Sequence, residues 1–258
     1  QIDDLQKLSG VKHLKGVTFW KEFIEITQRR NLLVHCKGIV SHQYIQKCND
    51  VGVNPLPSVG DTLIVDDGYF AKAYHIFYSM GVMLSQVIMR HLLGKDKVLG
   101  EIDTILNHNI YDALEEENYD LAIELSKFAL ADSTKHSCRL DEVYFVLNYA
   151  QAYKWKGDQS KCNKVLSDFD FSAMTSDILV AKYALEDDIN SVVEHMKKAG
   201  NNSKVMTKDA YVSWVIFKSI REMDEFKDAY KEIFGEELIT ELLTPEENKV
   251  VKEFEPES

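Results

Sequence analysis

Apolar residues at helical spacing restrict the N-terminal part of this chain to one kind of secondary structure. The series runs through six positions: Phe19, Phe23, Ile26, Leu33, Val40 and Tyr44. Intervals of three, four and seven residues mark one face of an α-helix, so we predict a single long helix from about Thr18, its N-cap, to Lys47. Four prolines and twelve glycines are few for 258 residues. An all-α fold is therefore predicted for the whole chain.

A short extended insert and a second long helix are expected next. The segment Thr62–Val65 is strand-like, and Asp67-Gly68 is a strong turn signal. The apolar stretch Tyr69–Leu93 then predicts a helix that is buried in protein, because polar side chains interrupt it too often for a membrane span. Together these elements predict a helical bundle with a short β-like insert over residues 1–97.

Shorter amphipathic segments follow from Leu99 onward, and four of them share a pattern of helix, small or acidic turn, and helix. Their turn residues are Asn118, Gly157, Asp187 and Met223, at intervals of 39, 30 and 36 residues. These intervals are close to the ~34-residue period of tetratricopeptide (TPR) repeats, and the string YAQAYKWKGD resembles that family. We expect a TPR-like helical repeat domain at 98–243 and a charged tail at 244–258. An irregular helical domain is the alternative for the repeats.

Charge is unevenly distributed along a chain whose net charge is −12. Residues 1–100 hold twelve Lys and Arg against nine Asp and Glu, a net +3, whereas residues 101–258 hold eighteen against thirty-three, a net −15. Contact with RNA phosphates therefore fits only the first segment. The acidic second segment should favour a basic or apolar protein partner.

Cysteine usage and the absence of recognisable signals narrow the class of protein. Cysteines at 36, 48, 138 and 162 form no C-x-x-C pair, which favours reduced thiols in the cytoplasm. No secretory signal opens the sequence, and the first residue, Gln1, leaves room for an upstream helix. Neither a phosphate-binding glycine loop nor a G-x-S-x-G string occurs. This disfavours nucleotide-dependent enzymes and serine hydrolases.

The string RRNLLVHC, Arg29–Cys36, places polar residues in an otherwise apolar helix. Asn31 and His35 are four residues apart and therefore share a face, while Arg30 lies about 100° to one side. An imidazole can accept or donate a proton near neutral pH, a guanidinium binds phosphate oxygens, and an amide can orient either group. These three side chains suit cleavage of RNA by its own 2′-hydroxyl.

Gly38 and His42 extend the same stripe, seven and eleven residues after Asn31. Glycine inside a helix costs about 1 kcal/mol relative to alanine. Close approach of another backbone, such as a partner helix, would explain why this cost is tolerated. We therefore expect Gly38 and His42 at a helix–helix interface.

This region resembles the HEPN superfamily. Residues Arg30 to His35 have its R-N-x-x-x-H form, and the longer string RRNLLVHCKGIVSHQYI is similar to a branch that reads RRN-x-x-VHN-x-G-x-V with a tyrosine shortly after. Gly38, Val40 and Tyr44 fit that branch, whereas Cys36 stands where it has asparagine. The resemblance covers roughly residues 15–95.

The resemblance implies an HEPN-like bundle and a metal-independent, dimeric endoribonuclease that needs no cofactor. It implies that Arg30, Asn31 and His35 from two facing copies cleave RNA to a 2′,3′-cyclic phosphate and a 5′-hydroxyl. Arg29 and Lys37 are then expected to bind RNA, and Gly38 and His42 to lie at the dimer interface. No metal is expected, because the histidines show no ligand spacing.

The predicted function is thus a cytoplasmic ribonuclease, a toxin or antiviral-defence effector, whose TPR-like region binds a protein or peptide. One alternative is a catalytically inactive HEPN-like dimerisation module in a scaffold or regulatory protein, and another is a helical regulator without HEPN ancestry. At the level of residues, the competing interpretation is a buried polar network in which Glu25 or Glu22 pairs with Arg29 or Arg30.

Overall fold

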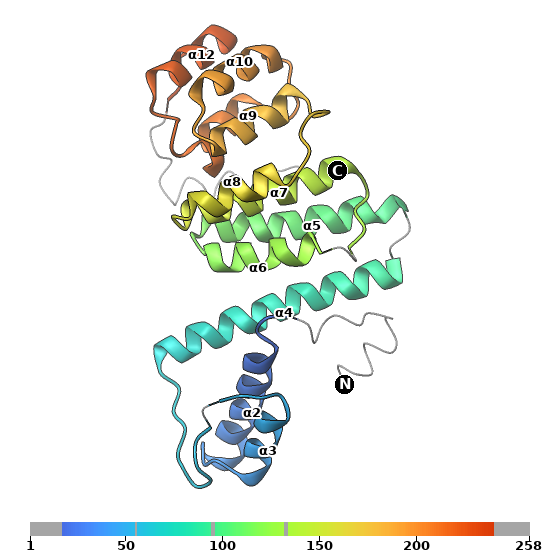
Figure 1. Ribbon diagram of the computed structural model, residues 1–258, viewed down its shortest axis with the longest axis vertical. Helices are drawn as coiled ribbons and strands as arrows, with labels where there is room; N and C mark the ends of the chain where they lie inside the picture. Colours follow the sequence, from blue (N-terminus) through green and yellow to red (C-terminus); the bar gives the residue numbers. More distant parts are fainter. Residues whose placement is uncertain (1–16, 55, 94–95, 132–133, 240–258) are drawn as a thin grey trace. The chain divides into compact units, whose positions relative to one another are not determined.

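The computed structural model describes residues 17–54, 56–93, 96–131 and 134–239, and this part of the chain consists of helices and loops (Figure 1). In chain order the elements are α2 (Trp20–Cys36), α3 (His42–Asp50), α4 (Asp67–Leu93), α5 (Asp96–Glu115), α6 (Tyr119–Ala129), α7 (Arg139–Trp155), α8 (Gln159–Ser167), α9 (Ser176–Leu185), α10 (Ile189–Ala199), α11 (Lys208–Ser213), the 3₁₀ turn η2 (Val215–Phe217) and α12 (Asp224–Phe234). The predicted all-α fold is confirmed for the described residues. The predicted tail at 244–258 lies outside them.

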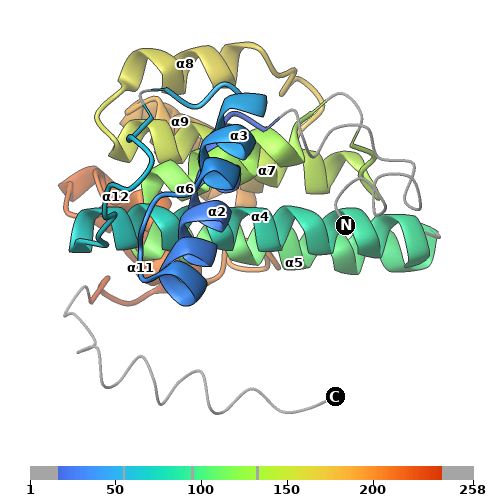
Figure 2. The ribbon, with the colours of Figure 1, turned by 90° about the horizontal axis from the view of Figure 1, so that it is seen from below.

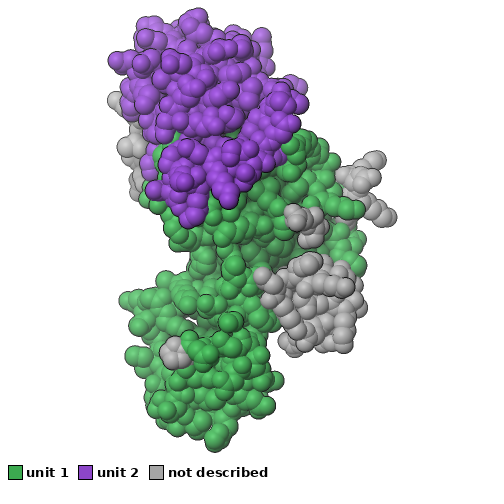
Figure 3. All heavy atoms as spheres, in the orientation of Figure 1, with its two compact units in different colours: residues 1–156 green, residues 157–258 purple. Residues whose placement is uncertain are grey.

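The chain divides into two compact units, residues 1–156 and 157–258 (Figure 3). In the first unit, one hydrophobic core takes buried side chains from α2, α4, α5, α6 and α7. The domain boundary expected after residue 97 falls within this core, because α5 packs against both α4 and α6. Buried apolar area is what makes a unit fold as one body, so α4 and α5 belong together.

Helix α2 lies across α4, as the view from below shows (Figure 2). The ring of Phe23 meets the ring of Phe77 edge to face, with centroids 5.6 Å apart. The C-terminal half of α2 takes part in a second, smaller core with α3 and the loop before α4. Its fully buried members are Leu32, Val40, Tyr44 and Cys48. This small core positions the candidate site.

The single long helix predicted from Thr18 to Lys47 is wrong, because the chain leaves the helical path after Cys36. Lys37 and Gly38 both have positive φ, 52° and 79°. A Cβ on Gly38 would lie 2.6 Å from the carbonyl oxygen of Leu63. Another backbone does come close at this glycine, as expected. It belongs to the loop around Leu63 of the same chain and not to a partner helix.

The N-cap prediction also fails. Phe19 is the N-cap of α2 and makes no side-chain cap, while the Thr18 hydroxyl donates to Glu124 at 2.5 Å. Instead, a side-chain cap starts α3, where Ser41 Oγ accepts from the backbone N–H of Tyr44 at 3.2 Å. A serine cap of this kind holds the second helix in its new direction.

The extended insert is shorter than predicted. No strand forms at Thr62–Val65, and in the described chain Thr62 makes only an isolated antiparallel bridge to Ile39. Asp67-Gly68 is not a turn but the first two residues of α4. Asp66 acts as the cap there, since its Oδ1 accepts from the backbone N–H of Tyr69 at 2.7 Å.

Helix α4 was expected to be buried, and only one face of it is. Ile76, Met80, Met83 and Val87 point into the large core, with at most 7 % of their surface exposed. Large apolar side chains elsewhere on the helix remain open to solvent, including Phe70 and Leu92. Among the described helices, α4 is also the one long and apolar enough to cross a membrane.

Three of the four predicted turns share one geometry. In each, a residue with positive φ precedes an Asn or Asp whose side chain accepts a backbone N–H of the next helix. The three pairs are Glu117-Asn118, Gly157-Asp158 and Asp187-Asp188. At the fourth position, Met223 is an N-cap with extended backbone and no side-chain cap. The helix-turn-helix pattern is therefore regular up to α10 and changes after it.

Candidate functional site

The face of α2 that carries Asn31 and His35 opens into a shallow cleft of about 290 Å³. Both side chains are exposed, and both line the cleft. The remaining lining residues come from α2 and from the start of α3: Gln28, Leu32, Cys36, Ser41, Gln43 and Tyr44. The local helix geometry thus brings these two predicted catalytic residues together, as expected from their spacing.

Arg30 lies beside this pair without lining the cleft. Its side chain is exposed, and its Nη1 donates to Asn31 Oδ1 at 3.4 Å, at the long end of hydrogen bonding. This long hydrogen bond is the contact that links the guanidinium to the Asn31 amide.

Arg29, which was expected to bind RNA, is held in an internal network. Its Nε donates to Glu25 Oε1 at 2.7 Å, and its guanidinium stacks over the Tyr69 ring at 4.0 Å. Glu25 also accepts from the hydroxyls of Tyr44 at 2.8 Å and Tyr69 at 2.9 Å. The Glu25–Arg29 pair is one of the pairings that the competing structural interpretation expected. Through the hydroxyls of Tyr44 and Tyr69, Glu25 also joins α2 to α3 and α4.

The pKa shifts of Arg29, Tyr44 and Tyr69 agree with these hydrogen bonds to Glu25. Burial lowers the pKa of Arg29, but the nearby Glu25 carboxylate outweighs this and leaves that pKa raised. Burial and Glu25 together raise the pKa values of Tyr44 and Tyr69. Both phenols therefore stay protonated and donate to Glu25. This cluster stabilises the helix junction and offers little to catalysis.

The other predicted site residues occupy the break between α2 and α3. Lys37 is exposed and provides the left-handed residue that ends α2. Gly38 is buried against Leu63, so its backbone contacts its own chain. His42 is exposed as the first residue of α3 and does not continue the α2 stripe, because the helix is broken before it.

A second cleft, of about 450 Å³, lies between α2, the loop after α3 and the start of α4. Tyr44 lines both clefts. Lys21 and Lys72 line the second cleft from α2 and α4, and neither is among the predicted site residues. Their signal in the sequence is only that of exposed lysines on helices, which local spacing cannot distinguish from solvated charge.

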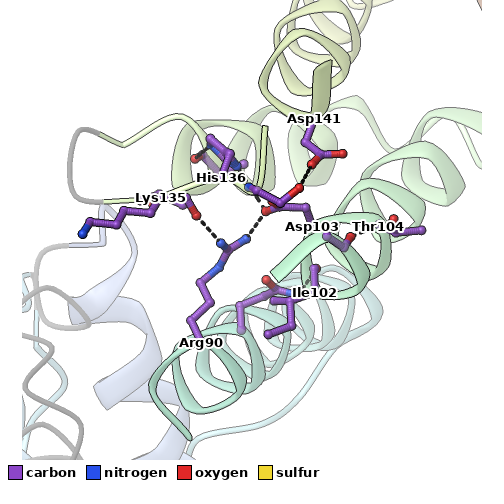
Figure 4. A network of polar contacts seen from close by, with 12 residues as sticks. Arg90, Ile102, Asp103, Thr104, Lys135, His136 and Asp141 are labelled. Atoms are coloured by element: carbon purple, nitrogen blue, oxygen red, sulfur yellow. Dashed lines mark hydrogen bonds and ion pairs between the residues drawn. The ribbon is translucent and has the colours of Figure 1, made fainter. Parts of the chain in front are cut away.

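The most buried charged group in the described chain lies outside both clefts (Figure 4). Asp103 on α5 is 1 % exposed and accepts from Arg90 Nη2 at 2.5 Å and from the backbone N–H of Ser137 at 2.8 Å. His136 Nδ1 lies 3.1 Å from the same carboxylate, and its Nε2 lies 3.1 Å from the Ala129 carbonyl oxygen. Both ring nitrogens face acceptors, so both hydrogen bonds form only with a doubly protonated imidazole.

This network ties α4, α5 and the segment before α7 to one carboxylate. Burial raises the pKa of Asp103, but hydrogen bonds from His136, Arg90 and Ser137 more than offset it and leave that pKa lowered. Both oxygens of the Asp103 carboxylate accept hydrogen bonds, and the residues of this network line neither of the two clefts described above, so we interpret it as structural. Sequence reasoning missed it because its members are far apart in the chain.

Metal binding finds no support in the described part of the chain. No group of three or more His, Cys, Asp and Glu residues is positioned there to hold an ion. Cys36 and Cys138 are exposed, and Cys48 and Cys162 are buried, all four as free thiols.

Comparison of the chain with protein-family models, with curated proteins and with solved structures gives no match. Inference about function therefore rests on the residues and the geometry of the chain itself.

Proposed function

We propose that this chain is a metal-independent endoribonuclease of HEPN type that acts as a homodimer in the cytoplasm. The observation that carries this proposal is the exposure of Asn31 and His35 in one open cleft, one helical turn apart. A purely structural polar network would bury and pair these side chains, as it does for Arg29 and Glu25. The R-N-x-x-x-H string adds the resemblance to that family.

The chemistry follows from the groups at the cleft. His35 removes the proton of a ribose 2′-hydroxyl or protonates the leaving 5′-oxygen, and the second copy's imidazole supplies the other role. Arg30 stabilises the charge that develops on the phosphate, and Asn31, which accepts from Arg30, positions it. Lys37 extends the positive surface for RNA at the end of α2. The products are a 2′,3′-cyclic phosphate and a 5′-hydroxyl.

The repeated turns of the second half support a TPR-like region that binds a protein or peptide. Stacked helical pairs provide extended surfaces for such partners, and the net charge of −15 over residues 101–258 favours a basic one. In this proposal the acidic region senses a partner, and the nuclease acts as a toxin or antiviral-defence effector.

The test is cleavage of a single-stranded RNA by the purified protein in the presence of a chelator. His35→Ala and Arg30→Ala should each lower the rate by about 10²–10⁴-fold, the usual contribution of a general acid or base. His91→Ala, an exposed histidine at the end of α4, is the matched control and should keep full activity. An RNA with a 2′-deoxy residue at the scissile position should resist cleavage. Activity that survives both site substitutions would refute the catalytic assignment.

A second candidate is a catalytically inactive HEPN-like dimerisation module in a helical scaffold. The position of Arg30 outside the cleft and Cys36 in place of asparagine favour it. This candidate predicts no RNA cleavage under any of these conditions, and it predicts that the same substitutions alter only association or stability.

A further inference from the structure

Helix α4 carries an apolar stripe that the described chain leaves mostly exposed, although Ile88 is half-buried and Phe77 contacts Phe23 of α2. The stripe follows one face of the helix at intervals of four, three, four, seven and four residues: Phe70, Tyr74, Phe77, Gly81, Ile88 and Leu92. Phe70, Tyr74, Phe77 and Leu92 are 65 %, 63 %, 43 % and 69 % exposed. Since 100° separates successive residues, these positions point away from the buried face of the same helix. The largest exposed apolar patch on a soluble protein is often a site of interaction.

The stripe is self-complementary about its glycine. Gly81 lies next to the middle of α4, which runs from Asp67 to Leu93. If a second α4 crosses antiparallel about a two-fold axis at Gly81, residue 77 lies opposite 85, residue 74 opposite 88 and residue 70 opposite 92. The two large aromatic residues of one end then meet the aliphatic residues of the other end. A C2 interface requires this kind of pairing of a surface with itself.

Gly81 itself points to an external contact. A Cβ at this position would meet no atom of the described residues within 4 Å, so their packing does not require glycine there. Glycine in a helix interior nevertheless costs about 1 kcal/mol relative to alanine. Close approach of two backbones at the axis would account for the residue, as small residues do where helices cross closely. Gly38 differs, because its own chain fills the space beside it.

We infer that the α4 stripe is the surface on which a second copy of this chain docks. This inference rests on the proposed function in so far as that function needs a dimer, and it names the surface. At roughly 200 Å² per large side chain, the exposed parts of Phe70, Tyr74, Phe77 and Leu92 amount to about 480 Å² in each copy. Two copies bury about 960 Å² from these residues alone, and flanking positions such as Ser85 bring the total near the ~1,200 Å² of a stable interface.

The same face continues toward the candidate site. Phe23 of α2 packs against Phe77 of the stripe. Arg30 is seven residues after Phe23 and therefore lies on the same face of α2. Docking on the stripe thus takes place beside the face that carries Arg30.

A lipid surface is the other occupant that an apolar helix of this length suggests. The opposite face of α4 argues against a membrane span. Gln86 is fully buried and donates to the Ile102 carbonyl at 3.1 Å, and Arg90 pairs with Asp103. Helix α4 would have to leave this core in order to enter a bilayer.

The experiment measures association of the full-length protein by sedimentation velocity over a range of concentrations. Wild-type protein should be a dimer, and the double variant F70E/Y74E should be a monomer with an unchanged circular dichroism spectrum, because both side chains are exposed. Lys72→Glu changes the net charge by the same amount on α4 but lies off the stripe, and it should remain a dimer. A monomeric wild type, or a double variant that dimerises like the wild type, would overturn the inference.

A cross-linking readout tests the position of the axis. Gly81→Cys should form a disulfide-linked dimer under mild oxidation, whereas Ala71→Cys, exposed on the same helix but off the stripe, should match the wild-type background. Equal cross-linking of the two variants would overturn the inference. So would partition of the wild type, but not F70E/Y74E, into phosphatidylcholine vesicles without dimer formation.

Failure of the inference and failure of the proposed function give different results. A dimer that F70E/Y74E abolishes, together with no RNA cleavage, supports the stripe and refutes the nuclease. RNA cleavage by a dimer that the stripe variants leave intact supports the nuclease and refutes the stripe.

Discussion

Replacement of Gly38 by alanine should destabilise the first unit by more than the left-handed backbone alone can explain. A non-glycine residue at φ 79° costs about 1–2 kcal/mol. The new methyl group would also lie 2.6 Å from the Leu63 carbonyl oxygen, which is backbone and cannot move like a flexible side chain. Relief of this contact stretches the hydrogen bond from Leu63 N–H to the Gly38 carbonyl, now 2.9 Å long and worth about 1 kcal/mol. The expected loss is the sum of these two terms, about 2–3 kcal/mol.

Gly60 is the matched control for this experiment. Its φ is 94°, but a Cβ there would meet nothing within 4 Å. Gly60→Ala should therefore lose only the backbone term of about 1–2 kcal/mol. The difference between the two variants isolates the close approach of Leu63.

The assay is urea unfolding of the full-length protein, followed by far-UV circular dichroism. Both glycines belong to the unit of residues 1–156, so any separate transition of residues 157–258 should stay unchanged. Equal losses for Gly38→Ala and Gly60→Ala would refute the reasoning. A Gly38→Ala variant with wild-type stability but weakened association would instead show that a partner backbone, and not Leu63, occupies the space.

Three further predictions follow from the packing and the charges. Asp103→Asn should destabilise the first unit by about 3 kcal/mol, because it removes the buried counter-ion of the half-buried Arg90 guanidinium. Since the folded pKa of Asp103 is lowered, its contribution is fully present above the unfolded value near ~3.9 and is lost as the pH falls through the lower folded value. Acid titration of stability should therefore be shallower in that variant, and an unchanged titration curve would contradict the assignment. Asn118→Ala removes the cap of α6 and should cost about 1 kcal/mol in urea unfolding, whereas Met223→Ala, which removes no side-chain cap, should cost less. Gly81→Ala should raise the unfolding free energy by about 1 kcal/mol when it is added to the monomeric variant F70E/Y74E. As a single substitution it should weaken dimerisation, measured by sedimentation velocity. A gain in both stability and dimerisation would argue against a close crossing of helices at this residue.

Much of the fold could be predicted because it is encoded locally. The second long helix was expected at Tyr69–Leu93 and forms at Asp67–Leu93, since its apolar content is uninterrupted by proline or by a cap signal. The three repeated turns were predictable because each contains an Asn or Asp directly before the next helix, where such a side chain can accept a backbone N–H.

The break in the first helix could not be found in the same way. Leu33 and Val40 are seven residues apart, so the apolar pattern keeps its helical phase across the interruption. The contact made at the break, between Gly38 and the Leu63 backbone of a loop far along the chain, depends on tertiary packing that local spacing does not show. The internal contacts of α4 were misjudged for a similar reason, because composition cannot show which face of an apolar helix has a partner.

In the candidate site, too, the features set by local spacing could be predicted and those set by tertiary packing could not. The shared cleft of Asn31 and His35 and the pairing of Glu25 with Arg29 both follow from a spacing of four residues on one helix. The donation of two tyrosine hydroxyls to Glu25 depends on tertiary packing of α3 and α4 and has no local signal.

The carboxylate of Asp103 has a practical consequence for excising the motif-bearing helices. A fragment that stops at residue 97 would keep Arg90 but discard its counter-ion, and it would strip α4 of the helices that cover its inner face. One that stops before residue 134 would retain the carboxylate and forfeit two of its three donors. The smallest autonomous piece that carries Arg30 and His35 should therefore extend to about Lys156, well past the segment in which those two residues occur.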